Sequence, residues 1–238
     1  MVNDMLTNPQ FSPTRLQAVL ERVNRALLAA GRPAGSVTLI GVTKTQPASV
    51  VGSAIAAGLR DLGENYLQEA VPKIEALREL RDAVQWHYIG QLQSNKTRPV
   101  AELFDWVHTV DRLKVAERLA TQRQFHGPAL NICLQVNIGA EASKGGVHPD
   151  DLPALARGVA ELPRLKLGGL MCIPPESDSA QVQRGYFAAL RQMRDNLNDR
   201  GFFLHTLSMG MSSDLEAAIM EGATHVRVGT AIFGERMK

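Results

Sequence analysis

The stretch Val37-Thr38-Leu39-Ile40-Gly41-Val42-Thr43, followed directly by Lys44, indicates the fold class of this chain. Its aliphatic and β-branched residues are consecutive, which is typical of a strand buried on both faces of a parallel sheet. Such sheets carry functional side chains at the carboxyl ends of their strands, where Lys44 stands. A desolvated lysine can attack a carbonyl, so Lys44 is a candidate Schiff-base residue. This segment alone favours the alternative, a lysine whose ammonium group reaches solvent.

Further apolar, strand-like runs follow, separated by segments with helical periodicity. The predicted strands after the first span Arg60 to Glu64, Val84 to Gly90, Trp106 to Val110, Leu130 to Asn137, Leu165 to Ile173, Phe203 to Met209 and His225 to Phe233. The helical patterns span Thr14 to Ala30, Ala48 to Ala57, Leu67 to Leu80, Arg112 to Gln124, Asp150 to Leu162, Ala180 to Asp199 and Asp214 to Glu221.

Strict alternation of strands and helices implies parallel pairing with right-handed crossovers. Eight such units in 238 residues favour an α/β fold, a (β/α)8 barrel of TIM type with an extra N-terminal helix. An open doubly wound sheet is the alternative. Because no linker or shift in composition divides the chain, residues 1–238 are expected to form one domain.

Composition excludes several classes of function. The net charge of +2 comes without a polybasic block, so we expect neither a nucleic-acid nor a membrane partner. No signal-type segment or membrane-length apolar run is present in the sequence, which makes the cytoplasm the expected compartment. Cys133 and Cys172 lie in apolar runs without metal-site spacing, so we expect two buried reduced thiols and no zinc. Nothing in the sequence demands a partner chain, and a monomer is expected.

The predicted strand ends carry mostly small or polar residues. The candidates at the barrel mouth are Lys44, Glu64, Asn65, Gly90, Gln91, Asn137, Met171, Ser208, Met209, Gly229 and Thr230. Each of these residues alone is compatible with an ordinary turn or helix cap.

Two stretches near the carboxyl end give the sharpest signal. They are Ser208-Met209-Gly210-Met211-Ser212-Ser213-Asp214, which leads into a helix, and Arg227-Val228-Gly229-Thr230. Small residues let backbone N–H groups approach an anion, and the hydroxyls and the helix start add donors and a favourable dipole. A helix cap at Ser212 or Ser213 would explain the serines but not the Gly229-Thr230 pair. The pattern favours a phosphate site.

Arg227 has two interpretations. On a strand between Val226 and Val228, its side chain points either into the barrel, where a ligand nitrogen or carboxylate would pair with it, or outward to a helix carboxylate. A phosphorylated aldehyde would suit this combination of groups: an amine at the first strand, a phosphate site at the last two strands and an arginine between them. Pyridoxal phosphate is the obvious candidate.

From about Leu39 onward the sequence resembles the pyridoxal phosphate homeostasis proteins, single-barrel relatives of the N-terminal domain of alanine racemase. The resemblance rests on the order of several stretches: Val42-Thr43-Lys44, Gly63-Glu64-Asn65-Tyr66, the run from Trp86 to Lys96, Gly169-Leu170-Met171, Ser208 to Asp214 and Arg227 to Gly234. It implies that Lys44 forms the internal aldimine with pyridoxal 5'-phosphate and that Ser208, Gly229 and Thr230 contact the phosphate. It also implies that Asn65 and Met209 lie near the ring and that Arg227 faces the pyridine nitrogen.

The resemblance implies a carrier of the cofactor in pyridoxal phosphate homeostasis and not an enzyme. A guanidinium group does not readily give up a proton, so a ring nitrogen facing Arg227 stays unprotonated and the ring is a poor electron sink. Racemases of this kind add an acid/base residue from another domain, for which this sequence has no room. The alternatives are a racemase of low activity and a Schiff-base aldolase without cofactor. Apo enzymes that use pyridoxal phosphate are the expected protein partners.

Three further residues invite a functional interpretation. His87 is expected to be a packed or hydrogen-bonded barrel residue rather than a general base. Lys96 is expected to be a solvated lysine at a helix start. The alternative is that Lys96 is a second lysine, besides Lys44, that responds to the cofactor. Asp214 is expected to serve the start of its helix.

Overall fold

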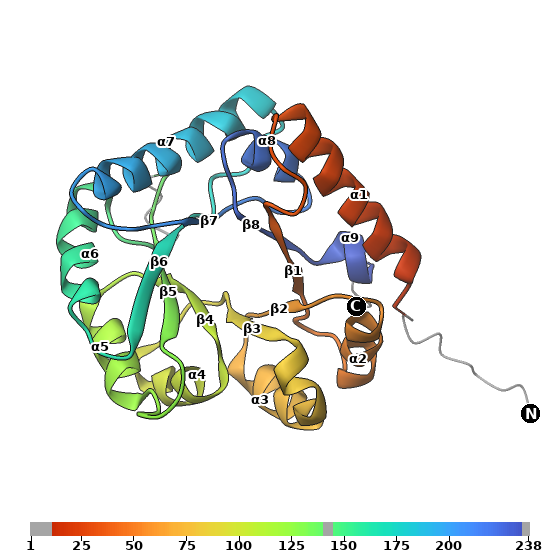
Figure 1. Ribbon diagram of the computed structural model, residues 1–238, viewed down its shortest axis with the longest axis horizontal. Coiled ribbons are helices and arrows are strands. Elements are labelled where there is room, and N and C mark those ends of the chain that lie inside the picture. The colour runs from red at the N-terminus through yellow and green to blue at the C-terminus, as the bar shows by residue number, and fades with distance from the viewer. Residues whose placement is uncertain (1–10, 140–144, 235–238) are drawn as a thin grey trace, which may run out of the picture.

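Eight parallel strands close into a barrel in the computed structural model, which describes residues 11–139 and 145–234. The strands follow one another around the barrel in chain order, and β1 pairs with both β2 and β8 (Figure 1). Their bounds are β1 Thr38–Val42, β2 Asp61–Glu64, β3 Gln85–Tyr88, β4 Trp106–Val110, β5 Leu130–Gln135, β6 Leu165–Met171, β7 Thr206–Ser208 and β8 His225–Val228. The predicted (β/α)8 barrel is confirmed, and the open sheet is excluded.

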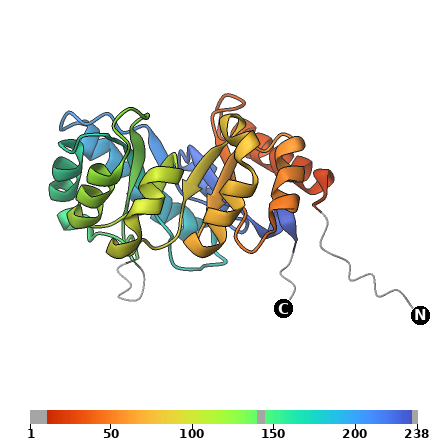
Figure 2. The same ribbon diagram turned by 90° about the horizontal axis from the view of Figure 1, so that it is seen from below.

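Helices form a ring outside the strands (Figures 1 and 2). The α-helices are α1 Pro13–Ala29, α2 Ala48–Ala56, α3 Leu67–Ala76, α4 Thr97–Leu103, α5 Leu113–Gln122, α6 Leu152–Ala160, α7 Ala180–Asn198, α8 Leu215–Met220 and α9 Thr230–Phe233. Short 3-10 helices span Arg78–Ala83 (η1), Ser94–Lys96 (η2) and Pro149–Asp151 (η3). The apolar face of α1 packs along α8 and α9, so the extra N-terminal helix covers the place where the barrel closes.

The core has two layers, because each strand presents alternate residues to the helices and to the barrel interior. Trp86 and Tyr88 of β3 are buried in the apolar core cluster, whereas His87 between them points the other way. The interior is unusually polar for a barrel, since His87, Trp106, His108 and His225 lie within 5.2–6.2 Å of one another, measured between ring centroids. Such polar groups need partners inside the barrel.

One predicted element differs in type from the structure, and one helix of the structure was not predicted. The run from His225 to Phe233 is not one strand: β8 ends at Val228, and Thr230–Phe233 form α9. The buried Ile232 and Phe233 made that helix resemble a continued strand. Helix α4, which the pattern did not predict, holds Pro99 in its first turn, where proline costs little because the backbone N–H has no helical partner.

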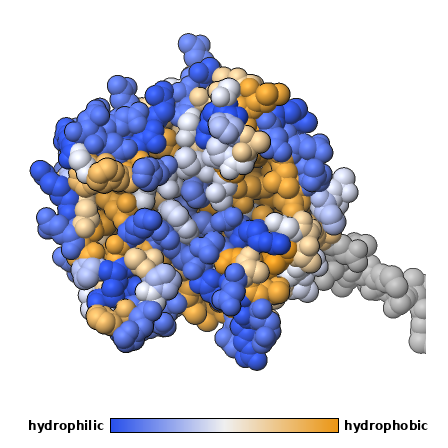
Figure 3. Space-filling view, in the orientation of Figure 1, coloured by the Kyte–Doolittle hydropathy of each residue, from blue (hydrophilic) through white to orange (hydrophobic). Residues whose placement is uncertain are grey.

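The molecular surface is mainly hydrophilic on the face drawn in Figure 3, with apolar side chains gathered beside the centre of the barrel. Within residues 11–139 and 145–234, no helix is long and apolar enough to cross a membrane. Cys133 and Cys172 are buried free thiols, as predicted, and burial raises the pKa of each thiol.

Candidate functional site

A pocket of about 320 Å³ lies at the carboxyl ends of the strands and joins the first strand to the last. Its lining includes five of the predicted site residues: Lys44, Asn65, Arg227, Gly229 and Thr230. Lys44 follows β1, Asn65 follows β2, and the other three belong to β8 and the start of α9. The structure therefore brings together an amine, an amide, a guanidinium group and a hydroxyl.

The loop that carries Lys44 is held by helix α3. Thr45 adopts a left-handed backbone conformation with φ 65°, and its N–H donates to Glu69 Oε2 over 2.6 Å. Lys73 Nζ donates to the carbonyl oxygen of Thr43 over 2.7 Å. Because backbone hydrogen bonds fix the residues on both sides of Lys44, the origin of its side chain is fixed as well.

A buried ion pair lies behind this loop. Lys73 Nζ is 2.5 Å from Glu64 Oε1, and the same oxygen accepts a hydrogen bond of 2.6 Å from the hydroxyl of Thr43. Burial raises the pKa of Glu64, while the ammonium of Lys73 opposes that rise. Glu64 therefore supports the site from inside the core and does not line the pocket.

Arg227 points inward, which decides between its two predicted orientations. Its side chain is only 4% exposed, donates to Ser208 Oγ over 2.8 Å and to the carbonyl oxygen of Cys172 over 2.9 Å, and lines the pocket. Burial lowers the pKa of Arg227, yet arginine stays charged in proteins. The pocket thus contains a fixed positive charge.

A loop between β7 and α8 forms one wall of the pocket through Met211, Ser212 and Ser213. Asp214 Oδ1 accepts a hydrogen bond of 2.5 Å from the N–H of Met211, which closes the loop. Arg22 of α1 donates to the carbonyl oxygen of Ser212 over 3.0 Å and forms an ion pair of 2.7 Å with Glu216 of α8. The N-terminal helix therefore holds this wall in place from outside the barrel.

Ser208 and Met209 take a different place from the other predicted site residues. Both are fully buried, and neither lines the pocket. The hydroxyl of Ser208 meets Arg227 and, at 2.8 Å, His108 Nδ1. Their predicted contacts with a cofactor stay predictions.

Several lining residues were not predicted as site residues. They are Val42, Ile89, Ile173, Met211, Ser212 and Ser213. Ser212 and Ser213 belong to the stretch from Ser208 to Asp214 that the sequence analysis selected. They line the pocket in place of Ser208 and Met209 because β7 ends at Ser208, so that the residues after the strand reach the mouth of the barrel.

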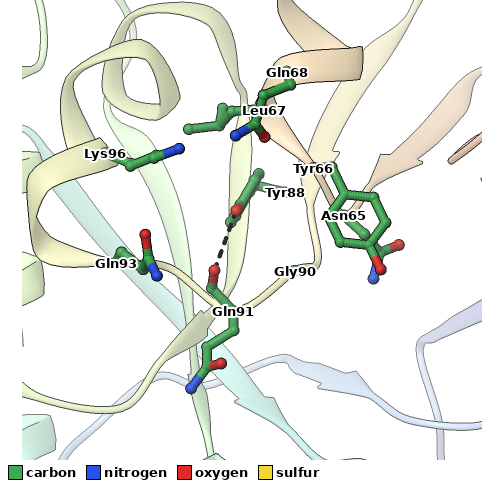
Figure 4. A pocket seen from close by; sticks show the side chains of 9 residues that line it. All are labelled: Asn65, Tyr66, Leu67, Gln68, Tyr88, Gly90, Gln91, Gln93 and Lys96. Atoms are coloured by element: carbon green, nitrogen blue, oxygen red, sulfur yellow. Dashed lines mark hydrogen bonds between the residues drawn. The ribbon is translucent and has the colours of Figure 1, made fainter.

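A second pocket of about 420 Å³ adjoins the first at Asn65. It is lined by Asn65, Tyr66, Leu67, Gln68, Tyr88, Gly90, Gln91, Gln93 and Lys96. Figure 4 shows the side chain of Lys96 extending toward Leu67 and Gln68, and the hydroxyl of Tyr88 donating to the carbonyl oxygen of Gln91. Lys96 thus lines a polar cavity and is half-buried rather than fully exposed to solvent.

The part of the chain that the structure describes contains no group of three or more metal-ligating side chains. A (β/α)8 barrel with a lysine after β1 and small polar residues after β7 and β8 is a barrel of the alanine racemase type. The family model described as "Alanine racemase, N-terminal domain" matches residues 15–237.

Within this class, the chain belongs to the pyridoxal phosphate homeostasis proteins. It is 56% identical to the pyridoxal phosphate homeostasis protein of Pseudomonas aeruginosa, over 92% of this chain and 93% of that protein. It is 50% identical to that of Escherichia coli K12, over 93% and 95% of the two chains. The structure of PipY from Synechococcus elongatus PCC7942, with pyridoxal phosphate bound, superposes with a TM-score of 0.78 at 39% identity and covers 89% of this chain and 100% of that chain.

Proposed function

We propose that this protein binds pyridoxal 5'-phosphate in intracellular cofactor homeostasis and holds it covalently on Lys44 without robust catalysis. The observation that carries the proposal is the single pocket in which Lys44 of the first strand meets Arg227, Gly229 and Thr230 of the last. The names of the relatives and the cofactor in PipY support it.

The residues of the pocket fit the functional groups of this cofactor. The cofactor supplies an aldehyde that condenses with an amine and releases water. Lys44 provides the amine, and the hydroxyls of Ser212, Ser213 and Thr230 are placed to donate to a phosphate. Asn65 Oδ1 is buried without a hydrogen-bond partner among the described residues, so it is available to a hydroxyl group of a ligand.

Two features of the pocket argue against efficient turnover. Arg227 donates hydrogen bonds only, so it leaves a ring nitrogen unprotonated and weakens the ring as an electron sink. Among the described residues that line the pocket, Lys44 and Arg227 are the only Lys, Arg, His, Asp, Glu, Cys or Tyr side chains. The pocket therefore presents no pair of acid/base groups to both faces of an amino acid.

The substitution Lys44→Ala tests the proposal. We expect the purified protein to show a visible absorbance band with pyridoxal phosphate and, after borohydride reduction, an adduct on the peptide containing Lys44. Lys44→Ala should lose both signals, because alanine has no amine. Lys96→Ala, which removes a lysine from the neighbouring pocket, is the matched control and should keep them. An undiminished adduct in Lys44→Ala would sink the assignment.

A racemase of low activity is the alternative that shares this site. An alanine racemase of Clostridium difficile has the same fold, with a TM-score of 0.68 at 14% identity, which supports the fold alone. Exchange of the α-proton of alanine into deuterated water distinguishes the two functions. Sustained exchange that depends on Lys44 would overturn the carrier function, whereas a bound cofactor without exchange supports it.

The carrier function implies a cytoplasmic location and transfer of the cofactor to apo enzymes that need it. The mouth of the pocket, where Ser213 and Thr230 are both exposed, is the surface from which the cofactor would leave. We propose that the protein acts as a monomer, which light scattering of the loaded protein would test.

A further inference from the structure

A chain of hydrogen bonds crosses the inside of the barrel and ends at the pocket. His87 Nε2 lies 3.0 Å from Asp61 Oδ1, and His87 Nδ1 lies 2.9 Å from His108 Nε2. His108 Nδ1 lies 2.8 Å from Ser208 Oγ, to which Arg227 also donates over 2.8 Å. The chain runs from the first residue of β2, through β3, β4 and β7, to β8. It links one end of the barrel to the arginine of the pocket.

For neutral imidazole rings, the chemistry of the two ends fixes the direction of every bond between them. The carboxylate of Asp61 can only accept, so His87 donates to it from Nε2 and accepts at Nδ1 from the Nε2–H of His108. His108 then accepts at Nδ1 from the hydroxyl of Ser208, whose oxygen accepts from Arg227, which can only donate. With both imidazoles neutral, a single arrangement satisfies all four bonds, and each ring carries its proton on Nε2.

The surroundings of His108 favour its neutral state. His87, His108 and Ser208 are fully buried, while the side chain of Asp61 is 24% exposed. Burial is the main reason that the pKa of His108 lies well below its usual range. The nearby His87, His225 and Arg227 lower it further. Asp61 of β2 faces His87, and His225 and Arg227 of β8 lie near His108. The titratable groups near Arg227 are Cys133 of β5, Cys172 after β6 and Asp214 before α8.

We propose that Asp61, His87 and His108 are positioning residues of the pyridoxal phosphate pocket, which act on Arg227 through Ser208 by a hydrogen-bond chain of one fixed direction. The proposal about the pocket rests on the proposed function, whereas the direction of the chain does not. Because the hydroxyl of Ser208 donates its hydrogen bond to His108, its oxygen accepts from the guanidinium of Arg227. The carbonyl of Cys172 fixes a second guanidinium nitrogen, so Arg227 faces the pocket in one orientation.

The direction of the chain is measurable before any cofactor is added. In protein labelled with nitrogen-15 at the histidine rings, at neutral pH, we expect His87 and His108 to be neutral with the proton on Nε2. A nitrogen–nitrogen coupling through the hydrogen bond should join the two rings. A proton on Nδ1 of either ring, or an imidazolium ion, would overturn the fixed direction even if the protein binds pyridoxal phosphate.

The exposed end of the chain gives a variant that spares the core. Asp61→Ala removes the final acceptor, whereas Asp61→Asn keeps an amide oxygen that accepts from His87. We expect Asp61→Ala to shift the guanidinium resonances of Arg227 and to release pyridoxal phosphate about three- to tenfold faster, as the loss of one buried hydrogen bond implies. Asp61→Asn should restore both signals to nearly those of the original protein. Equal behaviour of the two variants would overturn the proposal.

A second pair of variants separates the chain from simple ring packing. His108→Phe and His225→Phe each keep an aromatic ring inside the barrel, but only His108 belongs to the chain. His225 bonds instead to Thr224 Oγ1 over 2.9 Å. We expect only His108→Phe to change the Arg227 resonances and the absorbance of the bound cofactor. Equal changes in His225→Phe would show a packing effect and contradict the assignment. If His108→Phe does not fold, the Asp61 pair decides.

Discussion

Lys73 is a buried cation that supports the backbone of the site. Its ammonium group bridges the carboxylate of Glu64 and the carbonyl of Thr43, directly before Lys44. A buried ion pair is costly to break, because the remaining charge has neither water nor a partner. Glu64 Oε2 already has no hydrogen-bond partner among the described residues, so Glu64 depends on Oε1 for its pairing.

We expect Lys73→Met to lower the free energy of unfolding by about 3–5 kcal/mol, the usual cost of an uncompensated buried charge. Urea unfolding followed by circular dichroism measures this change. The double variant Lys73→Met with Glu64→Gln is the control, because it removes both charges and should recover much of the loss. A single variant as stable as the original protein would contradict the supporting role of the pair.

At the residue scale the sequence predicted the lining residues that stand directly beyond a strand. Lys44, Asn65, Gly229 and Thr230 follow from the rule that such positions meet at one end of the barrel. Ser208 shows the limit of that rule, because it is the last residue of β7 and points inside. The Asp61–His87–His108 contacts could not be predicted, since their register depends on how three strands pair.

Helix α1 contacts the loop that lines the pocket through Arg22. Arg22 reaches both Glu216 of α8 and the carbonyl of Ser212 in the loop that lines the pocket. An exposed ion pair contributes little to stability, because solvent screens it. We therefore expect the ion pair of Arg22 to position the loop and to contribute little to the stability of the fold.

We expect Arg22→Ala to weaken pyridoxal phosphate binding about three- to fivefold and to lower the free energy of unfolding by less than about 1 kcal/mol. Titration followed by absorbance, together with urea unfolding, measures the two effects. Arg78→Ala removes an exposed ion pair with Glu75, and because neither residue lines the pocket it should change neither quantity. Equal binding by the two variants would exclude a role of α1 in the site.

At the element scale, periodicity predicted the strands better than their ends. The bounds of β4 agree with the prediction residue for residue, because polar residues flank a short apolar run. The last predicted strand was wrong after Val228, because a short buried helix and a buried strand carry the same apolar residues.

The polar interior makes the stability of the whole barrel depend on pH. Burial lowers the pKa of His225 to about 4 and lowers that of His108 well below the ordinary 6.5. Between the folded and unfolded pKa values the unfolded chain binds more protons, so acid favours unfolding. This contribution to stability is present in full above pH 6.5 and is lost as the pH falls toward the folded value.

We expect the free energy of unfolding to fall by up to about 1.4 kcal/mol per pH unit for each of these histidines as the pH drops below 6.5. Urea unfolding at a series of pH values measures the slope. His225→Phe, which cannot take up a proton, should remove the part of the slope that belongs to His225. If that variant keeps the full slope between pH 6.5 and 4.5, His225 is not neutral in the folded protein.

The pairing of β1 with β8 has a consequence for folding. Lys44 and Arg227 are far apart in the sequence, and the pocket that both line exists only when the two strands pair. A partly folded chain in which β1 has not yet met β8 therefore has no complete pocket. Closure of the barrel is the step that completes the pocket, so occupancy of the pocket reports on the folding of the whole molecule.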